Sequence, residues 1–374
     1  MAPDTALSFP DIPSRAPPMS GNRSPMSGAA TLPTQDFHQR GSSAATRWMM
    51  SSNRRRTLQT LGALALMRAW PSLAQTPTPG TTRLLVGFPP GATGDRIART
   101  VSPLLAAQVH SSVIVDNKPG AGGQLAIEYA KTAHADGSVL LQTIGSSMVI
   151  YPHTYRSLRY DPFGDFVPLG TAATAPIAFV SAARLQVKTV GDAVSLISQD
   201  KSVAFYGSPA SGSVLHFSGV LMARAMGSEF THVPYKGSAP ALADVLSAQM
   251  PFAFLALSDI LEHHRTGKLR ILAVTGTTRA SQLPDVPTFP EAGFKDLVNR
   301  EWFSYFLSKG TPPELVARYG AALRKVVADP DLRAALLAAG LEIGDGDATT
   351  LAATMQKEFG QWRQVVKEIG FVAD

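Results

Sequence analysis

Residues 83–99 read RLLVGF, then PPGATGD, then RIAR, and this stretch constrains the fold more than any other. Residues 83–88 form a short apolar run bounded by turn formers, which predicts a buried strand. Prolines and glycines interrupt the pattern over 89–94, and from Asp95 the apolar residues fall at helical spacing. A loop between a strand and a helix start directs unpaired backbone N–H groups at one point, which attracts an anion. Taken alone, an ordinary turn with a helix cap explains the loop equally well.

A second stretch repeats this pattern far along the chain. Residues 201–207 (KSVAFYG) predict a strand, SPASGS follows at 208–213, and apolar residues at helical spacing come next. Strands also alternate with helical segments between these two stretches, which predicts an α/β fold with mainly parallel sheets covered on both faces. Ligands bind such sheets beyond the carboxyl ends of the strands, where the loops at 89–95 and 145–147 are expected. The two similar stretches predict one site shared between two lobes.

Composition supports a globular protein and argues against a nucleic-acid-binding one. A chain of 374 residues with 45% apolar residues is long enough for two domains with sizeable cores. Eight of the 34 basic residues and three of the 28 acidic ones lie in residues 1–74, which leaves 26 basic and 25 acidic residues in the remainder. The remainder is therefore nearly neutral and has no basic cluster of the kind that binds nucleic acid.

The front of the chain has the pattern of an export signal. Residues 1–48 are rich in Pro, Ser and Gly, and we predict a disordered extension or a start codon assigned too early. Residues 49–74 contain a basic segment with three arginines, a short apolar segment and a small-x-small cleavage site, which predicts a signal peptide, through the Sec or the twin-arginine route. The chain contains no cysteine, which excludes disulfides, thiolate metal sites and a lipid-anchored cysteine. We expect a protein that is soluble in the periplasm after cleavage.

The familiar catalytic and cofactor motifs fail in this sequence. GAGG at 120–123 lacks the third glycine of a dinucleotide fingerprint, no phosphate-binding P-loop is present, and no serine has the GxSxG frame of a hydrolase. The histidines lack metal-ligand spacing. We therefore predict no cofactor, no metal and no catalytic residue.

Three titratable residues near the loops have more than one interpretation. His216 follows the second loop, where a packing or capping role is as well supported as a ligand contact. Asp95 would repel an anion, so we interpret it as a residue that stabilises the helix start, or that holds an amine or a water. Lys236 in VPYKG is interpreted as a solvated turn lysine in preference to a ligand contact.

The chain resembles the extracytoplasmic solute receptors of tripartite tricarboxylate transporters, the TctC or Bug-type receptors. The resemblance covers residues 82–372 and rests on an ordered series of motifs. These are FPPGATGD at 88–95, VDNKPGAGG at 115–123, ADGSVLL at 135–141, YPHTY at 151–155, YDPFGDF at 160–166, YGSPASGS at 206–213, HVPYKGSAPAL at 232–242, GKLRILAVT at 267–275 and LPDVPTFPEAGF at 283–294.

The resemblance implies a two-lobed periplasmic-binding-protein fold, type II-like, with a ligand cleft between the lobes. The first lobe is expected to comprise residues 81–178 and 300–374, and the second lobe residues 179–299. The family binds a ligand carboxylate largely through main-chain N–H groups and water. Carried over to this sequence, the ligand-binding residues are Phe88, Gly91, Ala92, Thr93, Gly94, Asp95, Gly145, Ser146, Ser147, Ser208, Ala210, Ser211, Gly212, Ser213, His216 and Ser258.

This chain departs from the family pattern at three places. The family has two glycines after the two prolines, whereas Gly91 is followed here by Ala92. Pro251 replaces an aspartate, and Ser308-Lys309 replaces Ala-Pro. We expect a monomeric, non-catalytic receptor that delivers a small carboxylate to the permease of a tripartite transporter. A module that presents its ligand to a sensor protein, or an enzyme on the same two-lobe scaffold, are the alternatives.

Overall fold

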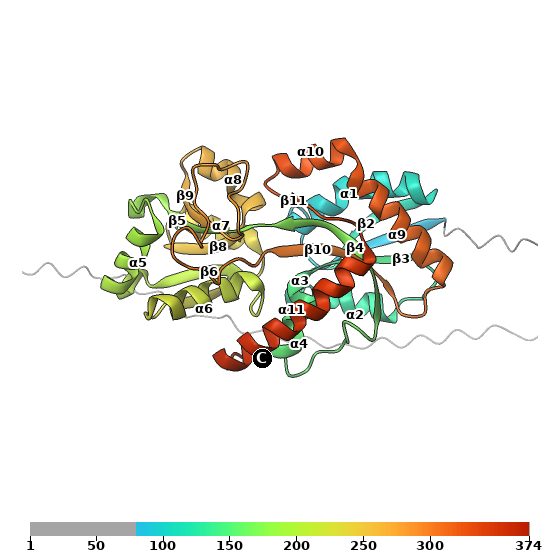
Figure 1. Ribbon diagram of the computed structural model, residues 1–374, viewed down its shortest axis with the longest axis horizontal. Helices are drawn as coiled ribbons and strands as arrows, with labels where there is room; N and C mark the ends of the chain where they lie inside the picture. Colours follow the sequence, from blue (N-terminus) through green and yellow to red (C-terminus); the bar gives the residue numbers. More distant parts are fainter. Residues whose placement is uncertain (1–79, 374) are drawn as a thin grey trace, which may run out of the picture. The chain divides into compact units, whose positions relative to one another are not determined.

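A computed structural model describes residues 80–373, which belong to one compact unit. Within this range two β-sheets are each flanked by helices, so the predicted two-lobed α/β fold is confirmed (Figure 1). The predicted extension at 1–48 and the predicted signal peptide at 49–74 lie outside the described residues. None of the helices between residues 80 and 373 combines the length and the apolar character needed to cross a membrane.

The first lobe is built on a six-stranded sheet. β1 pairs in parallel with β2 and β3, whereas β10 runs antiparallel to both β3 and β4. All residues of β3 and β10 are buried, because helices cover both faces of this sheet. In sheet order the strands are β11 (Glu342–Ile343), β4 (Phe166–Ala175), β10 (Glu301–Ser308), β3 (Val139–Ile144), β1 (Thr81–Val86) and β2 (Ser112–Asn117).

The helices of the first lobe pack on this sheet through apolar faces. In α1 the buried residues Ile97, Val101 and Leu105 recur at the helical spacing that the sequence predicts. The helices are α1 (Thr93–Val109), α2 (Gln124–Thr132), α3 (Gly145–Val149), α4 (Tyr151–Thr154), α9 (Pro313–Ala328), α10 (Pro330–Ala338) and α11 (Ala348–Ile369), with one 3₁₀ turn at η1 (Ala121–Gly123).

The second lobe has a five-stranded sheet with its own helices (Figure 1). In sheet order the strands are β7 (Thr231–Tyr235), β6 (Phe205–Pro209), β8 (Phe252–Ala256), β5 (Ile177–Ala182) and β9 (Leu269–Val274). The helices are α5 (Val190–Gln199), α6 (Val214–Met226), α7 (Ser238–Leu246) and α8 (Leu257–Arg265), with 3₁₀ turns at η2 (Ala183–Leu185) and η3 (Lys201–Val203).

Both sheets are mixed, which differs from the mainly parallel sheets that the sequence predicts. β4 leaves the first sheet and continues through Pro176 into β5 of the second, and β10 returns to the first sheet. β5 pairs antiparallel with β8 and β9, as β10 does with β3 and β4. The strands that enter each lobe, β10 and β5, therefore run against its βαβ strands, whereas the leaving strands β4 and β9 run with them. Hydrophobic periodicity does not indicate the direction of a strand.

Two local predictions also need correction. Residues 145–147 are not a loop, since they form the first turn of α3. The predicted strand at 201–207 begins as the turn η3 and becomes a strand only at Phe205.

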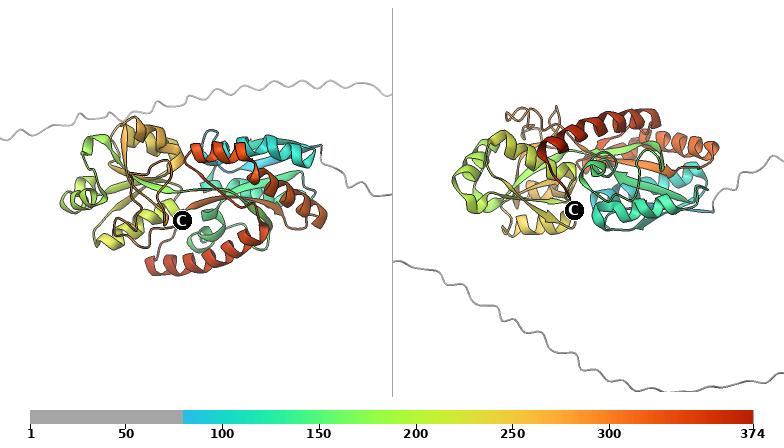
Figure 2. Two further views of the ribbon diagram at one scale, coloured as in Figure 1. Left: turned by 45° about the horizontal axis from the view of Figure 1, so that its top comes forward. Right: turned by 90° about the horizontal axis from the view of Figure 1, so that it is seen from below.

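The last helix connects the two lobes. α11 lies against β4 and α3 of the first lobe. Trp362 of α11 contacts Phe217 of α6 with ring centroids 5.5 Å apart, and Phe371 contacts His216 at 4.6 Å. Figure 2 shows the same helix along one side of both lobes. Aromatic contacts at the chain end therefore fix α6, the helix that follows the second loop.

A glycine in α6 tests how closely this helix packs on Tyr206 of β6. A Cβ at Gly219 would lie 2.2 Å from ring carbons of Tyr206, whereas a Cβ at the helical Gly191 meets nothing closer than 3.6 Å. We expect Gly219→Ala to lower the free energy of unfolding by about 1–3 kcal/mol through overpacking. Gly191→Ala, the control, is expected to raise it by up to about 1 kcal/mol. Urea unfolding measures both, and an unchanged midpoint in Gly219→Ala would contradict the packing described.

Candidate ligand site between the lobes

A cavity of about 360 Å³ is lined by residues of both lobes. The segment from Phe88 to Gly94, which comprises the loop after β1 and the first residues of α1, contributes one side. Pro209, Ala210 and Ser213 line it from the end of β6 and the loop before α6, and residues 236–240 line it from the start of α7. The two strand–loop–helix segments that the sequence singles out therefore meet at one cavity.

The start of α1 exposes backbone donors that its own helix does not use. The N-cap residue, Ala92, has an extended backbone and makes no side-chain cap hydrogen bond. The first intrahelical bond runs from Arg96 N to Ala92 O, so the N–H groups of residues 93–95 have no acceptor within the helix. Since Ala92, Thr93 and Gly94 line the cavity, this helix start can receive an anion there.

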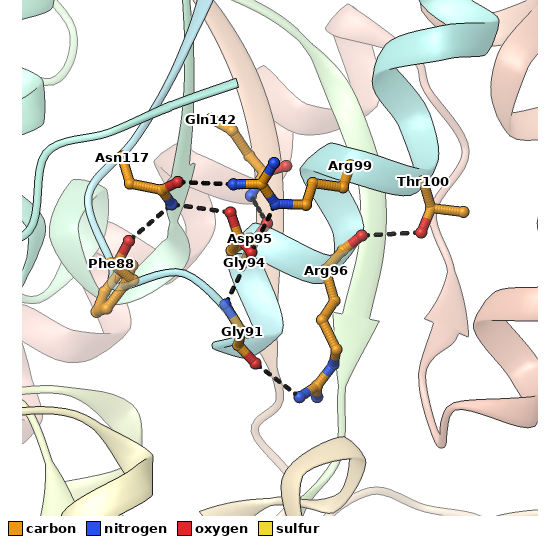
Figure 3. Close-up of polar contacts among 9 residues, drawn as sticks. All are labelled: Phe88, Gly91, Gly94, Asp95, Arg96, Arg99, Thr100, Asn117 and Gln142. Atoms are coloured by element: carbon orange, nitrogen blue, oxygen red, sulfur yellow. Dashed lines mark hydrogen bonds and ion pairs between the residues drawn. The ribbon is translucent and has the colours of Figure 1, made fainter. Parts of the chain in front are cut away.

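The side chain of Asp95 forms hydrogen bonds that hold the backbone of the first loop, as Figure 3 shows. Its Oδ2 accepts hydrogen bonds from Gly91 N at 2.8 Å and Arg99 Nε at 2.9 Å, and its Oδ1 accepts one from Asn117 Nδ2 at 2.9 Å. Burial by itself would raise the pKa of Asp95, but these hydrogen bonds and the charge of Arg99 lower it below the usual value. Asn117 also donates to Phe88 O at 3.0 Å. The carboxylate is thus neutralised inside the loop and does not line the cavity.

The start of α6 is already satisfied by protein groups. Val214 N donates to Ser146 Oγ at 2.9 Å, and His216 N donates to Ser213 Oγ at 3.4 Å. Gly212 N donates to His216 Nδ1 at 3.1 Å. The second loop therefore offers fewer unused donors than the first loop does, although Ala210 and Ser213 reach the cavity.

His216 fixes the second loop and is directed into the core. Its ring stacks on His232 at 4.0 Å, and His232 Nε2 forms a hydrogen bond with Ser208 Oγ at 2.8 Å. Burial, and then the neighbouring His232, lowers the pKa of His216 to about 3, and burial lowers the pKa of His232 to about 4. Both rings are therefore neutral at physiological pH. Ser208 has no exposed surface, so the serine–histidine pair is closed to a substrate.

Polar contacts join the lobes beside the cavity. Thr93 of α1 donates to Asp259 Oδ1 of α8 at 2.7 Å and lies 2.8 Å from Ser258 Oγ. Arg96 pairs with the same Asp259 oxygen at 2.9 Å and donates to Ser258 O at 3.0 Å. Ser258 thus contacts the first lobe and does not line the cavity, whereas Asp259 does.

Glu301 is a buried carboxyl in the cavity wall. Ser146 donates to it twice, from its backbone N at 3.0 Å and from its hydroxyl. Burial outweighs these bonds and raises the pKa of Glu301 to about 7. Because Ser146 Oγ also accepts from Val214 N, one serine connects Glu301 of the first lobe with the start of α6 in the second.

The predicted site residues fall into two groups. Seven of them line the cavity: Phe88, Gly91, Ala92, Thr93, Gly94, Ala210 and Ser213. Nine lie outside the lining and support it or belong to the core: Asp95, Gly145, Ser146, Ser147, Ser208, Ser211, Gly212, His216 and Ser258. A Cβ at Gly145 would lie 2.5 Å from the Trp302 ring, so this glycine serves packing.

The sequence analysis interprets Lys236 as a solvated turn lysine and does not single out Gly237 or Ser238 at the start of α7. Lys236, Gly237 and Ser238 line the cavity directly after strand β7, and α7 has no side-chain cap. The signal was present, since KGS follows a short apolar strand as the first two loops do. Arg96, Glu301 and Phe303 were missed as well, because nothing in their local sequence marks them. Within residues 80–373 no group of three or more acidic or histidine side chains is arranged to hold a metal ion.

Comparison with known proteins agrees with this architecture. A family model described as the tripartite tricarboxylate transporter family receptor matches residues 97–371. The chain belongs to this family. It is 30% identical over 289 residues to the UPF0065 protein in the tcbD-tcbE intergenic region of Pseudomonas sp. (strain P51), with 76% of this chain and 84% of that protein covered.

Two solved structures of relatives share the fold of this receptor. The periplasmic binding protein BugD is 25% identical, with a TM-score of 0.74, and the alignment covers 78% of this chain and 98% of BugD. Rpa4515 of R. palustris, solved with adipate, is 30% identical, with a TM-score of 0.75 and coverage of 78% and 98%. The resemblance inferred from the sequence motifs is therefore confirmed.

Replacing Asp95 tests whether it shapes the first loop. We expect Asp95→Asn to lower the free energy of unfolding by about 1–3 kcal/mol, because a buried acceptor of several hydrogen bonds is lost. Since the pKa of Asp95 is lowered on folding, this difference is expected to be full at neutral pH, to start falling near pH 4 and to disappear only below the lower folded-state pKa. Asp192, also the third residue of its helix, provides the control Asp192→Asn. Amide exchange at Gly91 should accelerate only in Asp95→Asn; equal rates in both variants would contradict this role.

Glu301 predicts a pH dependence of the opposite sign. A carboxyl whose pKa is raised on folding binds its proton more tightly in the folded chain, so its stabilisation is full below about 4.5 and is lost as the pH rises to about 7. Relative to Glu301→Gln, the natural protein should lose up to about 3 kcal/mol of stability over this range. Glu291, whose pKa is lowered by Thr288 N and Arg279, serves as control, because Glu291→Gln should change the profile only below about pH 4.5. Urea unfolding from pH 4 to 8 measures both, and parallel curves for Glu301→Gln and the natural protein would refute the assignment.

Proposed function

We propose that this protein is a periplasmic receptor that binds a small carboxylate in the cavity between its lobes and delivers it to the permease of a tripartite transporter. One observation carries the proposal: the uncapped start of α1 lines a cavity that both lobes enclose. The family membership supports it, and so does the relative Rpa4515, which was solved with adipate.

The carboxylate is proposed to bind at the N–H groups of Thr93 and Gly94, which line the cavity. These donors have no helical acceptor, and a ligand oxygen there would replace water as their partner. Lys236, which is exposed and lines the cavity, adds a positive charge from the second lobe. Because the site is built largely from peptide groups, it selects the carboxylate group itself more than any particular side-chain pattern.

Binding is proposed to couple the ligand to closure of the lobes. The cavity takes residues from both sheets, so a ligand gains all of its contacts only when the lobes are together. The contacts from Thr93 and Arg96 to Asp259 would form in the same movement. The closed form then presents one surface to the permease, which is how we interpret the transport role.

The remaining features follow from this role. We propose an exported, monomeric protein without catalytic activity or cofactor, whose lobes are residues 81–178 with 300–374 and residues 179–299. The buried serine–histidine pair gives no support to the enzyme alternative, because Ser208 is inaccessible.

A substitution at the helix start tests the function. Ala92→Asp should cap α1 and stabilise the fold by about 0.5–2 kcal/mol, yet place a carboxylate where the ligand's own is expected. Like charges brought together cost several kcal/mol, so acid binding should weaken by about tenfold or more. Ala92→Asn supplies the same cap without the charge, so it competes with the ligand for a backbone N–H of this helix start but does not repel it. Acid binding should therefore weaken less in Ala92→Asn than in Ala92→Asp. Calorimetric titration with adipate, malate, citrate and benzoate measures the affinities.

The ligand series carries its own control. The primary amide of each acid has a similar size but no charge and should not raise the melting temperature of the natural protein. Acids at a hundredfold excess over Kd should stabilise it by about 2.7 kcal/mol. If no acid binds at millimolar concentration, or if Ala92→Asp binds acids as well as Ala92→Asn, the proposed function is wrong.

A further inference from the structure

The charged side chains of the cavity are largely occupied by protein partners. Its lining contains four ionisable side chains, those of Arg96, Lys236, Asp259 and Glu301. Arg96 and Asp259 pair with each other at 2.9 Å, and both oxygens of Glu301 accept hydrogen bonds from Ser146. Of the four, this leaves Lys236, which is exposed, as the charge most available to a ligand.

The walls beyond the helix start are largely hydrocarbon. Phe88, Ile144 and Phe303 of the first lobe line the cavity, and Leu215, Pro240 and Leu242 line it from the second. Ile144, Leu215 and Phe303 are buried, so the cavity surface that they provide belongs to the packed interior. A ligand held by its carboxylate at α1 therefore has apolar side chains of both lobes around its body.

We propose that the receptor selects carboxylates with a hydrocarbon body, an aromatic ring or an alkyl chain, over hydroxylated di- and tricarboxylates such as malate and citrate. This inference rests on the proposed function and specifies its ligand class. The observation that supports this inference is that an uncapped helix start and apolar side chains of both lobes line the same cavity.

The physical reason is the cost of removing polar groups from water. A hydroxyl or a second carboxylate placed against Ile144, Phe303 or Leu215 loses its water without gaining a hydrogen-bond partner. A methylene in the same place leaves water favourably, and each one buried should tighten binding roughly fourfold. Chain length should therefore improve affinity until the cavity is full.

A homologous series of acids tests the preference. In calorimetric titrations of the full chain, Kd should fall by about fourfold per methylene from butyrate to hexanoate, and benzoate should bind more tightly than malate or citrate. Adipate is included, because its second carboxylate has Lys236 as a candidate partner and its chain is hydrocarbon.

Two leucines on one helix give a matched pair of variants. Leu242 and Leu246 are both half-buried residues of α7 packed on the same core cluster, but of the two only Leu242 lines the cavity. We expect Leu242→Ser to weaken hexanoate and benzoate by about tenfold and to leave malate unchanged. Leu246→Ser should leave all Kd values unchanged, and circular dichroism confirms that both variants fold.

The outcomes separate the inference from the function on which it rests. Tighter binding of hydrocarbon acids, lost in Leu242→Ser but kept in Leu246→Ser, supports both. If malate or citrate binds as tightly as hexanoate and benzoate, the receptor function stands and the ligand class is wrong. If the two leucine variants weaken hexanoate equally, the apolar wall does not set the preference. If no acid binds, the function fails and the inference fails with it.

Discussion

The structure depends on a helix that begins without a side-chain cap. A helix start leaves several backbone N–H groups without acceptors, and most proteins supply one from a Ser, Thr, Asp or Asn at the N-cap. Here Ala92 occupies that position and supplies none. An acidic residue in the first turn can also interact with these N–H groups, but the one present, Asp95, is buried. Its carboxylate accepts hydrogen bonds from Gly91, Arg99 and Asn117 instead. The first donors of α1 therefore lie at the cavity wall and have water or a ligand as their partner. Preorganised donors of this kind bind an anion without reorganising the loop.

The two helix starts that the sequence treats as equivalent have different functions. The donors of α6 are bound to Ser146, Ser213 and His216, so this start fixes the second lobe against the first. Chemical asymmetry between the lobes follows. The first lobe provides the polar end of the site, and α6 and α7 provide much of the enclosure, with Leu215, Pro240 and Leu242 toward the cavity. A ligand with a polar head and a hydrocarbon body matches this division.

Much of the fold and part of the candidate site could be predicted from the sequence, and the residues that were not predicted have physical reasons. The strand–loop–helix pattern at 83–99 is a local property, and it placed Ala92, Thr93 and Gly94 correctly at the cavity. The family resemblance implies a ligand role for Gly145 and His216, and the local sequence supports a packing or capping role for His216 equally well. The structure uses Gly145 to admit the Trp302 ring and His216 to hold Gly212 N, and both partners depend on tertiary packing. Glu301 and Phe303 reach the cavity from a strand far along the chain, and no local pattern marks residues that only the sheet order brings near.

The same cavity explains why its charged residues are paired. An isolated Asp259 beside α1 would compete with a ligand for the positive end of the helix, and an isolated Arg96 would bind any anion that entered. Paired with each other, they cancel in charge, and four hydrogen bonds among Thr93, Arg96, Ser258 and Asp259 hold α8 against α1. Interlobe contact and charge neutralisation are thus one interaction. Under the proposed function, it leaves the peptide groups of α1 as the main attraction for the ligand's carboxylate, and discrimination among acids depends on the side chains around the rest of the ligand.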